Sequence, residues 1–174
     1  MNFDGVQVRH VLAGEWGRLR ELRLASLAAD PDAFGSTYAR EVEQPAAWWE
    51  GWAARSESGT TQRTFVVVGD DDRWLGLALV RLDDAEARAA VLNAMWVAPE
   101  ARGRRAARAL CDACARWATE HGCGQLTLQV VVDNDAARRA YEAAGFVVSG
   151  QSTWSNGGRT LDEFDMARPL GAPD

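Results

Sequence analysis

The sequence contains no lysine, so arginine supplies all 19 of its basic residues. Aspartate and glutamate together number 25 and give a formal net charge of −6. A chain that binds long polyanions needs a basic domain or stripe, so we expect no nucleic-acid partner. No stretch approaches the roughly 20 consecutive apolar residues of a membrane-spanning helix, so we also expect no association with a membrane.

Cysteine is scarce, with three residues at uneven spacing, which excludes a disulfide framework and favours a reducing compartment. Residues 1–11 lack the basic and apolar regions of a secretion signal, so we predict a cytoplasmic protein. Cys111 and Cys114 share a C-x-x-C within a predicted helix, and Cys123 follows. Because no second ligand pair stands at zinc spacing, we interpret all three as small buried side chains and expect no metal.

A length of 174 residues with 47% hydrophobic content fits one domain, 1–174, and no linker or repeat divides it. Alternating and helical patterns predict an α/β (α+β) fold in the order β-α-α-β-β-β-α-β-α-β-β. The strands are expected at 6–12, 64–68, 74–82, 90–97, 125–132, 146–153 and 160–166, the last two around the turn at 156–158. The helices are expected at 15–29, 45–58, 106–121 and 135–144.

The segment 95–110, MWVAPEARGRRAARAL, joins a predicted strand to the start of a long helix. Four arginines cluster there without an acid: Arg102, Arg104, Arg105 and Arg108. They carry +4 in a chain of net charge −6, so the remaining residues sum to −10. A helix N-terminus offers unpaired N–H groups and a partial positive charge, so this segment predicts a site for a phosphate-bearing ligand. The alternative is a solvated basic helix face, while P-loop and Rossmann glycine patterns are absent.

A second motif, DNDAARRAYEAAGF at 133–146, follows the valine-rich strand. Together the two motifs resemble the GNAT acetyltransferase superfamily, whose members carry V-x-P-x-x-R-G-x-G-x-G/A and then N-x-x-A-x-x-x-Y-x-x-x-G-F. The first is matched by Val97, Pro99, Arg102, Gly103 and Ala107, and the second by Asn134, Ala137, Tyr141, Gly145 and Phe146. The resemblance implies a mixed, mostly antiparallel sheet flanked by about four helices. It also implies an acyl-CoA N-acyltransferase with acetyl-CoA as donor.

The resemblance further implies which residues hold the donor. Backbone groups of the first motif would bind the pyrophosphate, and the pantetheine arm would pair with the strand 95–97. The implied cofactor-binding residues are Met95, Trp96, Val97, Arg102, Gly103, Arg104, Arg105, Ala106, Ala107, Asn134, Ala137 and Tyr141. Asn134 also suits a helix N-cap. Arg105 replaces a glycine of the family pattern, and we expect helical backbone there, which arginine adopts freely.

Tyr141 is the predicted general acid, which would protonate the departing thiolate. An amine acceptor must lose a proton before it attacks, but Val91 and Gln129 stand where relatives often place a glutamate. Gln129 or Asn93 is a candidate for ordering a water. The carboxylates that remain open as the base are Glu41, Glu43, Asp133, Asp162 and Glu163.

Five aromatic residues occupy the part of the chain where the family builds its acceptor wall: Phe34, Tyr38, Trp48, Trp49 and Trp52. Aromatic rings in an acidic chain favour a small cationic, partly apolar amine, such as a metabolite or an antibiotic-like amine. The alternative for each tryptophan is core packing, which we predict for Trp16, Trp96 and Trp117. Protein N-terminal acetylation and non-catalytic CoA binding stay open as functions, and so do a monomer and a homodimer.

Overall fold

The computed structural model describes residues 2–3, 6–103, 105–156 and 159–171, so Arg104 and residues 157–158 of the predicted turn at 156–158 lie outside the described residues. Within these ranges one sheet of eight strands runs in the order β1-β2-β3-β4-β5-β6-β8-β7. The strands are β1 (Asn2–Phe3), β2 (Val6–His10), β3 (Gln62–Gly69), β4 (Trp74–Leu82), β5 (Ala89–Val97), β6 (Gln125–Val131), β7 (Val147–Asn156) and β8 (Arg159–Pro169). Neighbouring strands are antiparallel except β5 and β6, which confirms the predicted mixed, mostly antiparallel sheet.

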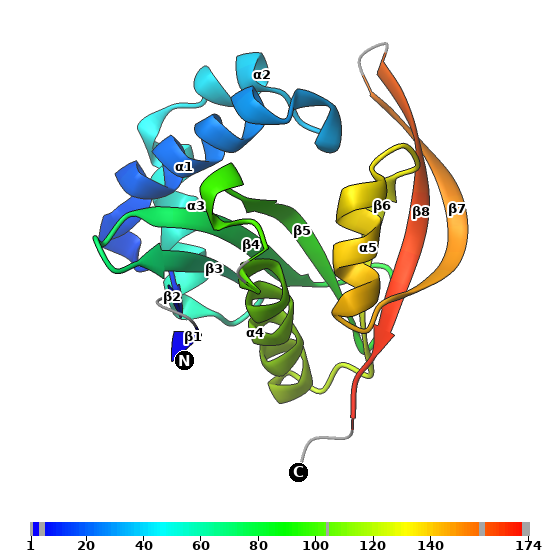
Figure 1. Ribbon diagram of the computed structural model, residues 1–174. Coiled ribbons are helices and arrows are strands. Elements are labelled where there is room, and N and C mark those ends of the chain that lie inside the picture. The colour runs from blue at the N-terminus through cyan, green and yellow to red at the C-terminus, as the bar shows by residue number, and fades with distance from the viewer. Residues whose placement is uncertain (1, 4–5, 104, 157–158, 172–174) are drawn as a thin grey trace.

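The helices flank this sheet in the predicted order, with additions that periodicity did not reveal (Figure 1). They are α1 (Trp16–Ala29), α2 (Tyr38–Val42), α3 (Ala46–Ser58), α4 (Ala106–Glu120) and α5 (Asp135–Ala143), with 3₁₀ turns at Ala13–Glu15, Pro31–Ala33 and Pro99–Ala101. The sequence pattern missed α2 and β1, because five residues and two residues are too short to show a period. Thr37 starts α2 by accepting a hydrogen bond from the Arg40 N–H at 3.3 Å.

Two hydrophobic cores lie on opposite faces of the sheet. On one face α4 buries Leu110, Cys114 and Trp117 together with residues of β3 to β6 and β8. On the other face α1 and α3 pack Leu19 and Trp49 against β3 and β4. The stripe of apolar residues on α4 explains why this helix forms and which face it buries.

The helix ends follow the turn chemistry of the sequence. Gly122 and Gly145 follow the ends of α4 and α5 with φ of +76° and +89°, a region that glycine enters without steric cost. Asp30 closes α1 before Pro31, as the Asp-Pro pair predicts.

The buried cysteines and most of the predicted core tryptophans are where the pattern indicated. Cys111, Cys114 and Cys123 are free and buried, and burial raises the pKa of the Cys111 thiol to about 12. Trp96 and Trp117 are buried, whereas Trp16 is half-buried at the edge of the core. Among the described residues no helix is long and apolar enough to cross a membrane.

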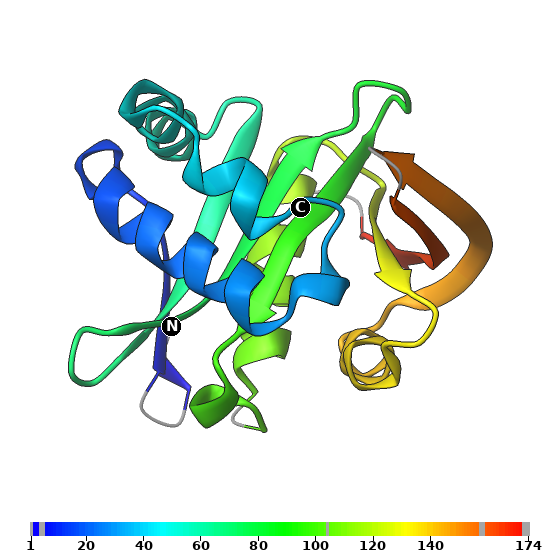
Figure 2. The ribbon, with the colours of Figure 1, turned by 90° about the horizontal axis from the view of Figure 1, so that it is seen from above.

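The sheet opens between β5 and β6. These strands pair in parallel only at Ala89–Gln125, Ala90–Leu126 and Val91–Thr127, near the start of each strand. Beyond these pairs β5 stays paired with β4, and β6 stays paired with β8. Seen from above, β6, β7, β8 and α5 stand apart from the rest of the sheet (Figure 2). The later part of β5 therefore has a backbone edge without a partner strand.

Candidate active site

The N-terminus of α4 begins at Arg105, whose backbone is left-handed with φ 58° and ψ 6°. The prediction of helical backbone at this position is wrong: the loop turns here through a conformation that favours glycine. A non-glycine residue in this region costs about 1 kcal/mol or more. The glycine of the family pattern therefore meets a backbone requirement that arginine satisfies under strain.

The first turn of α4 presents unpaired backbone donors. Among the described residues, the first N–H of α4 that bonds back into the turn is that of Ala109, to the Arg105 carbonyl at 2.9 Å. Ala106, Ala107 and Arg108 precede it, so their N–H groups have no intrahelical acceptor, and the N-cap side chain provides none. Ala106 is buried, Ala107 is half-buried and Gly103 is exposed in the preceding loop. This geometry is that of an anion-binding helix terminus.

The arginines of this segment have different partners. Arg102 donates to Asp30 at 2.7 Å and to the Val97 carbonyl at 3.0 Å, so it fastens the loop to the end of α1 and to β5. Arg108 donates to the Ala143 carbonyl at 3.2 Å and so joins α4 to α5. Arg105 is exposed and forms no ion pair with any described residue. Of the three described arginines, Arg105 is thus the one left without a partner that would compete with a ligand.

Strand β5 carries a bulge beside this loop. Its register with β4 shifts between the pairs Leu79–Asn93 and Leu77–Trp96, and Ala94 in the bulge has a φ of 51°. The Ala98 N–H bonds to the Leu75 carbonyl on β4. Because backbone groups alternate along a strand, the Val97 N–H points to the opposite, open edge. Met95, half-buried, lies two residues earlier on the same strand.

Asp30 connects this strand to the loop before α4. The Oδ2 atom of Asp30 accepts two hydrogen bonds, one from the Trp96 indole at 2.7 Å and one from Arg102 at 2.7 Å. Trp96, a predicted cofactor contact, therefore directs its polar edge to α1 and packs its ring in the core between the sheet and α1.

Helix α5 places the second motif across the opening. The Asn134 side chain accepts a hydrogen bond from the Ala137 N–H at 3.1 Å, so Asn134 is an N-cap, as its position in the sequence suggested. Capping uses the amide oxygen and leaves the amide N–H₂ available for a ligand. Ala137 is half-buried.

Tyr141 lies on the buried side of α5, with its ring 5.9 Å from that of Phe146. Its hydroxyl forms no hydrogen bond with any described residue, and the oxygen is not among the fully buried polar atoms that lack a partner. Burial raises the pKa of Tyr141 well above its usual range, so the phenol keeps its proton at neutral pH.

A pocket of about 420 Å³, here called the acceptor pocket, lies on the α1 and α3 side of the sheet and reaches the bulge of β5. It is lined by Arg23, Phe34, Gly35, Ser36, Glu41, Trp48, Trp52, Arg55, Gln62, Leu79, Asn93 and Ala94. Of the predicted acceptor aromatics, Phe34, Trp48 and Trp52 line it. Trp49 is fully buried in the core, and Tyr38 is 45% exposed outside the pocket.

Sequence reasoning missed Arg23 as a site residue. It stands four residues from both Leu19 and Leu27, which are fully buried, so a charged residue occupies the apolar stripe of α1. This charged residue within an apolar stripe could have been noticed in the sequence, because a charged side chain in a buried position requires a specific partner.

Trp154 on β7 was also missed. A Cβ placed on Gly35 would lie 3.3 Å from the Trp154 ring, so the two residues are in close contact. This contact joins the loop after α1 to the β7–β8 hairpin, and it depends on the absence of a side chain at Gly35. Nothing in a single sequence links positions so far apart.

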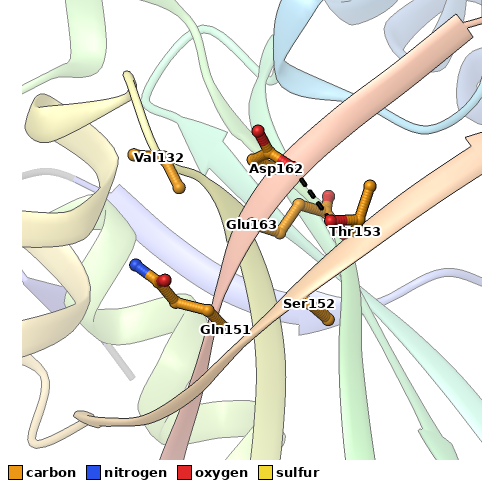
Figure 3. Close-up of a pocket in the computed structure, with 6 residues that line it drawn as sticks. All are labelled: Val132, Gln151, Ser152, Thr153, Asp162 and Glu163. Atoms are coloured by element: carbon orange, nitrogen blue, oxygen red, sulfur yellow. Dashed lines mark hydrogen bonds between the residues drawn. The ribbon is translucent and has the colours of Figure 1, made fainter.

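A second pocket of about 350 Å³ lies on the β7–β8 hairpin and is here called the hairpin pocket (Figure 3). Its lining residues are Val132, Gln151, Ser152, Thr153, Asp162 and Glu163. Thr153 donates a hydrogen bond to Asp162 at 2.9 Å. Burial, and then the charge of Asp165, raise the pKa of Glu163.

The other polar residues predicted for the site differ in their hydrogen bonding and exposure. Gln129 donates to Asp165 at 3.2 Å across β6 and β8, and Asn93 accepts from Arg81 at 3.2 Å across β5 and β4. Glu43 and Asp133 are exposed. In the part of the chain that the structure describes, no three metal-binding side chains come together.

The chain is similar in sequence to known acetyltransferases. The family model described as "Acetyltransferase (GNAT) family" matches residues 16–146. Streptothricin acetyltransferase of Streptomyces lavendulae is 36% identical over 105 residues, which cover 57% of this chain and 55% of that protein. This chain therefore matches little more than half the length of that relative.

Two solved structures share the architecture. A GCN5-related N-acetyltransferase from Kribbella flavida is 26% identical with a TM-score of 0.73, covering 96% of this chain and 99% of that one. The yncA protein of Salmonella typhimurium, a putative acetyltransferase with its cofactor acetyl-CoA, is 18% identical with a TM-score of 0.76, covering 97% and 98%. At 18% identity, the similarity to the yncA protein is a similarity of fold alone.

Proposed function

The chain belongs to the acetyltransferase (GNAT) family, and from this premise we propose that it transfers the acetyl group of acetyl-CoA to the primary amine of a small molecule. The observation that carries the proposal is one juxtaposition. The open edge of β5 runs from the acceptor pocket at Ala94 to the uncapped N-terminus of α4. A phosphate-bearing donor and an amine could therefore bind next to each other along one strand.

The residues around α4 fit the donor. Free N–H groups at 106–108 suit a pyrophosphate, and Arg105 adds an unpaired guanidinium beside them. When bound, acetyl-CoA supplies an activated thioester. The unpartnered edge of β5 can pair with an amide-containing arm, and the Asn134 amide N–H₂, which the cap leaves free, is available at the start of α5.

The Val97 N–H is the main-chain donor placed to polarise a thioester carbonyl. It lies on the open edge of β5, and the Val97 carbonyl is already fixed by Arg102. A preorganised backbone donor of this kind stabilises negative charge as it develops on oxygen.

Tyr141 is the proposed acid toward the leaving sulfur. Its hydroxyl is protonated and unpaired, so it can donate a hydrogen bond without first breaking one. A thiol has an ordinary pKa near 8.5, below that of this phenol, so the group stabilises the thiolate by hydrogen bonding more than by full proton transfer.

Glu163 is the proposed base among the carboxylates. It pairs with Ser152 across the hairpin, on the same face as Trp154, which contacts the acceptor-side loop at Gly35. Its raised pKa brings it closer to neutrality, as proton acceptance requires. Glu41 is already committed to Arg23, and Asp162 to Thr153. Gln129, held by Asp165 on the face that carries Glu163, is placed to order a water.

The test is release of free CoA thiol when the purified protein is mixed with acetyl-CoA and a panel of small primary amines. We expect amine-dependent thiol release, with CoA binding measured separately by calorimetry. Binding of CoA without turnover on any amine would instead support a non-catalytic binding domain. Turnover confined to peptides with a free N-terminus would support protein N-terminal acetylation, and absence of CoA binding would overturn the proposal.

A further inference from the structure

A buried ion pair forms one wall of the acceptor pocket. The Arg23 Nε and Nη2 groups donate to the two carboxylate oxygens of Glu41 at 2.9 and 2.8 Å. The two side chains are 6% and 8% exposed, so the pair is almost fully removed from water. This bidentate contact uses one edge of the guanidinium and fixes its plane.

The other edge of Arg23 is unused. Its Nη1 group is buried and has no hydrogen-bond partner among the described residues. The guanidinium also lies 4.8 Å over the Phe34 ring, which holds it in place but accepts no conventional hydrogen bond. A buried charged donor without an acceptor is unfavourable, so a ligand oxygen that reaches Nη1 would relieve that cost.

A second arginine lines the same pocket. Arg55 on α3 is exposed and forms no ion pair with any described residue. A Cβ on Gly51 would lie 3.2 Å from the Arg55 Nη1, so the side chain lies back along its own helix over the preceding turn. With Glu41 neutralising one of two guanidinium groups, the charged lining of the pocket sums to +1.

We infer that the acceptor amine carries a carboxylate, which Arg23 and Arg55 bind, while its apolar part packs on Trp48 and Trp52. The inference rests on the proposed function and specifies its acceptor class as amino acids or similar amino carboxylates. Trp48 and Trp52 meet edge to face with ring centroids 5.3 Å apart and form the apolar wall of the pocket. A polyamine, by contrast, would bring only like charge to the two arginines.

The experiment compares acceptors that differ only in the carboxylate. The pairs are phenylalanine with phenethylamine, leucine with isopentylamine, and lysine with cadaverine. Each is titrated calorimetrically into the CoA-loaded protein, and each is assayed for thiol release from acetyl-CoA. We expect the carboxylate-bearing member of at least one pair to bind and to react at least about tenfold better than its decarboxylated partner.

The matched variants are Arg55→Gln, Arg23→Lys and, as control, Arg40→Gln. Arg55 is exposed, so its replacement leaves folding intact, and Arg40 is exposed on α2 outside the pocket. Arg55→Gln and Arg23→Lys should each reduce the preference for the carboxylate about tenfold, and Arg40→Gln should keep it.

Equal or better binding and turnover of the decarboxylated amines overturns the inference and leaves the proposed function standing. The absence of carboxylate binding across the whole panel overturns it as well. Binding of the amino carboxylates that is lost in Arg55→Gln, with no thiol release from any amine, supports a carboxylate site at the two arginines and overturns the proposed function.

Discussion

The proposed donor side and the proposed acceptor side of this protein are built from different parts of the chain. Around α4 and β5 the groups offered to a ligand are backbone N–H groups, at a helix terminus and along a strand edge. In the acceptor pocket they are side chains, with a buried Arg23–Glu41 pair beside Phe34, Trp48 and Trp52. A site made of backbone depends on the course of the chain, whereas a site made of side chains depends on each residue in it.

This difference predicts different responses to substitution. On the donor side, a change of side chain should matter little unless it removes an N–H or alters the backbone. On the acceptor side, a single change can leave a buried charge without its partner. The variants below test this contrast, in order of expected effect.

Glu41→Ala should produce the largest change. It leaves the Arg23 guanidinium buried without a counter-ion, and breaking a buried pair in this way costs about 3 kcal/mol or more. Urea unfolding followed by circular dichroism measures the loss. Glu43→Ala, at an exposed position beside α2, is the matched control and should change stability by less than about 0.5 kcal/mol. Replacement of both partners in the double variant Arg23→Met, Glu41→Leu should restore most of the lost stability. If it does not, the loss in Glu41→Ala comes from packing and not from the unpaired charge.

Tyr141→Phe should reduce kcat about 100-fold, the loss of one hydrogen bond to the charged leaving group, with CoA affinity unchanged. Because the hydroxyl has no hydrogen-bond partner in the described structure, its removal should leave the unfolding midpoint close to that of the wild type. Steady-state kinetics and CoA calorimetry provide the readouts, with the exposed Tyr38→Phe as control. Wild-type kcat in an active Tyr141→Phe enzyme would refute the role of the phenol.

Ala107→Pro removes one N–H of the first turn of α4 without adding charge. Proline is tolerated in a first turn, so the helix should form, but a hydrogen bond to a charged ligand is lost. We expect CoA to bind about tenfold more weakly by calorimetry. Ala107→Ser keeps the N–H and should keep the affinity. Equal affinity in the proline variant would contradict a main-chain site.

Arg105→Gly tests side chain against backbone at the same place. Glycine adopts the left-handed φ of 58° without the steric strain that arginine has there. The relief of strain is partly offset because glycine gives the unfolded chain more conformational freedom, so the free energy of unfolding should rise by about 0.5 kcal/mol. CoA affinity should fall by no more than about threefold, because an exposed charge contributes little beside the backbone donors. A larger loss in calorimetry would assign the phosphate contact to the guanidinium.

Glu163→Gln should have a small effect on stability, and the size of that effect depends on pH. Burial raises the pKa of Glu163, so the folded protein binds this proton more tightly than the unfolded chain. The stability from that proton is present below the unfolded pKa of about 4.3 and is lost as pH rises through the folded pKa. Relative to wild type, the glutamine variant should therefore gain stability from pH 4 to pH 7, by less than about 1 kcal/mol. A pH-independent difference in urea midpoints would contradict this, and unchanged kcat would remove Glu163 as the base.

The chain geometry of the proposed donor side was predictable from sequence because it is local. A strand, a short loop and an arginine-rich helix start are contiguous, and the Asn134 cap and Gly145 mark α5 in the same way. The left-handed backbone at Arg105 escaped prediction because its neighbours indicated a helix. The acceptor side was predictable only as a group of aromatic residues, of which Trp49 packs in the core. Its Arg23–Glu41 pair and its Gly35–Trp154 contact join distant segments, and no local pattern encodes such pairing.

Asp30 gives the two sides a mechanical connection. Its carboxylate holds the Trp96 indole of β5 and the Arg102 guanidinium of the loop before α4, while its own backbone leads into the segment that carries Phe34. If a ligand on the proposed donor side orders this junction, the wall of the acceptor pocket that follows Asp30 in the chain is ordered with it. By the reciprocity of linked equilibria, the acceptor then strengthens donor binding by the same factor. Any such coupling has the same size whichever ligand binds first.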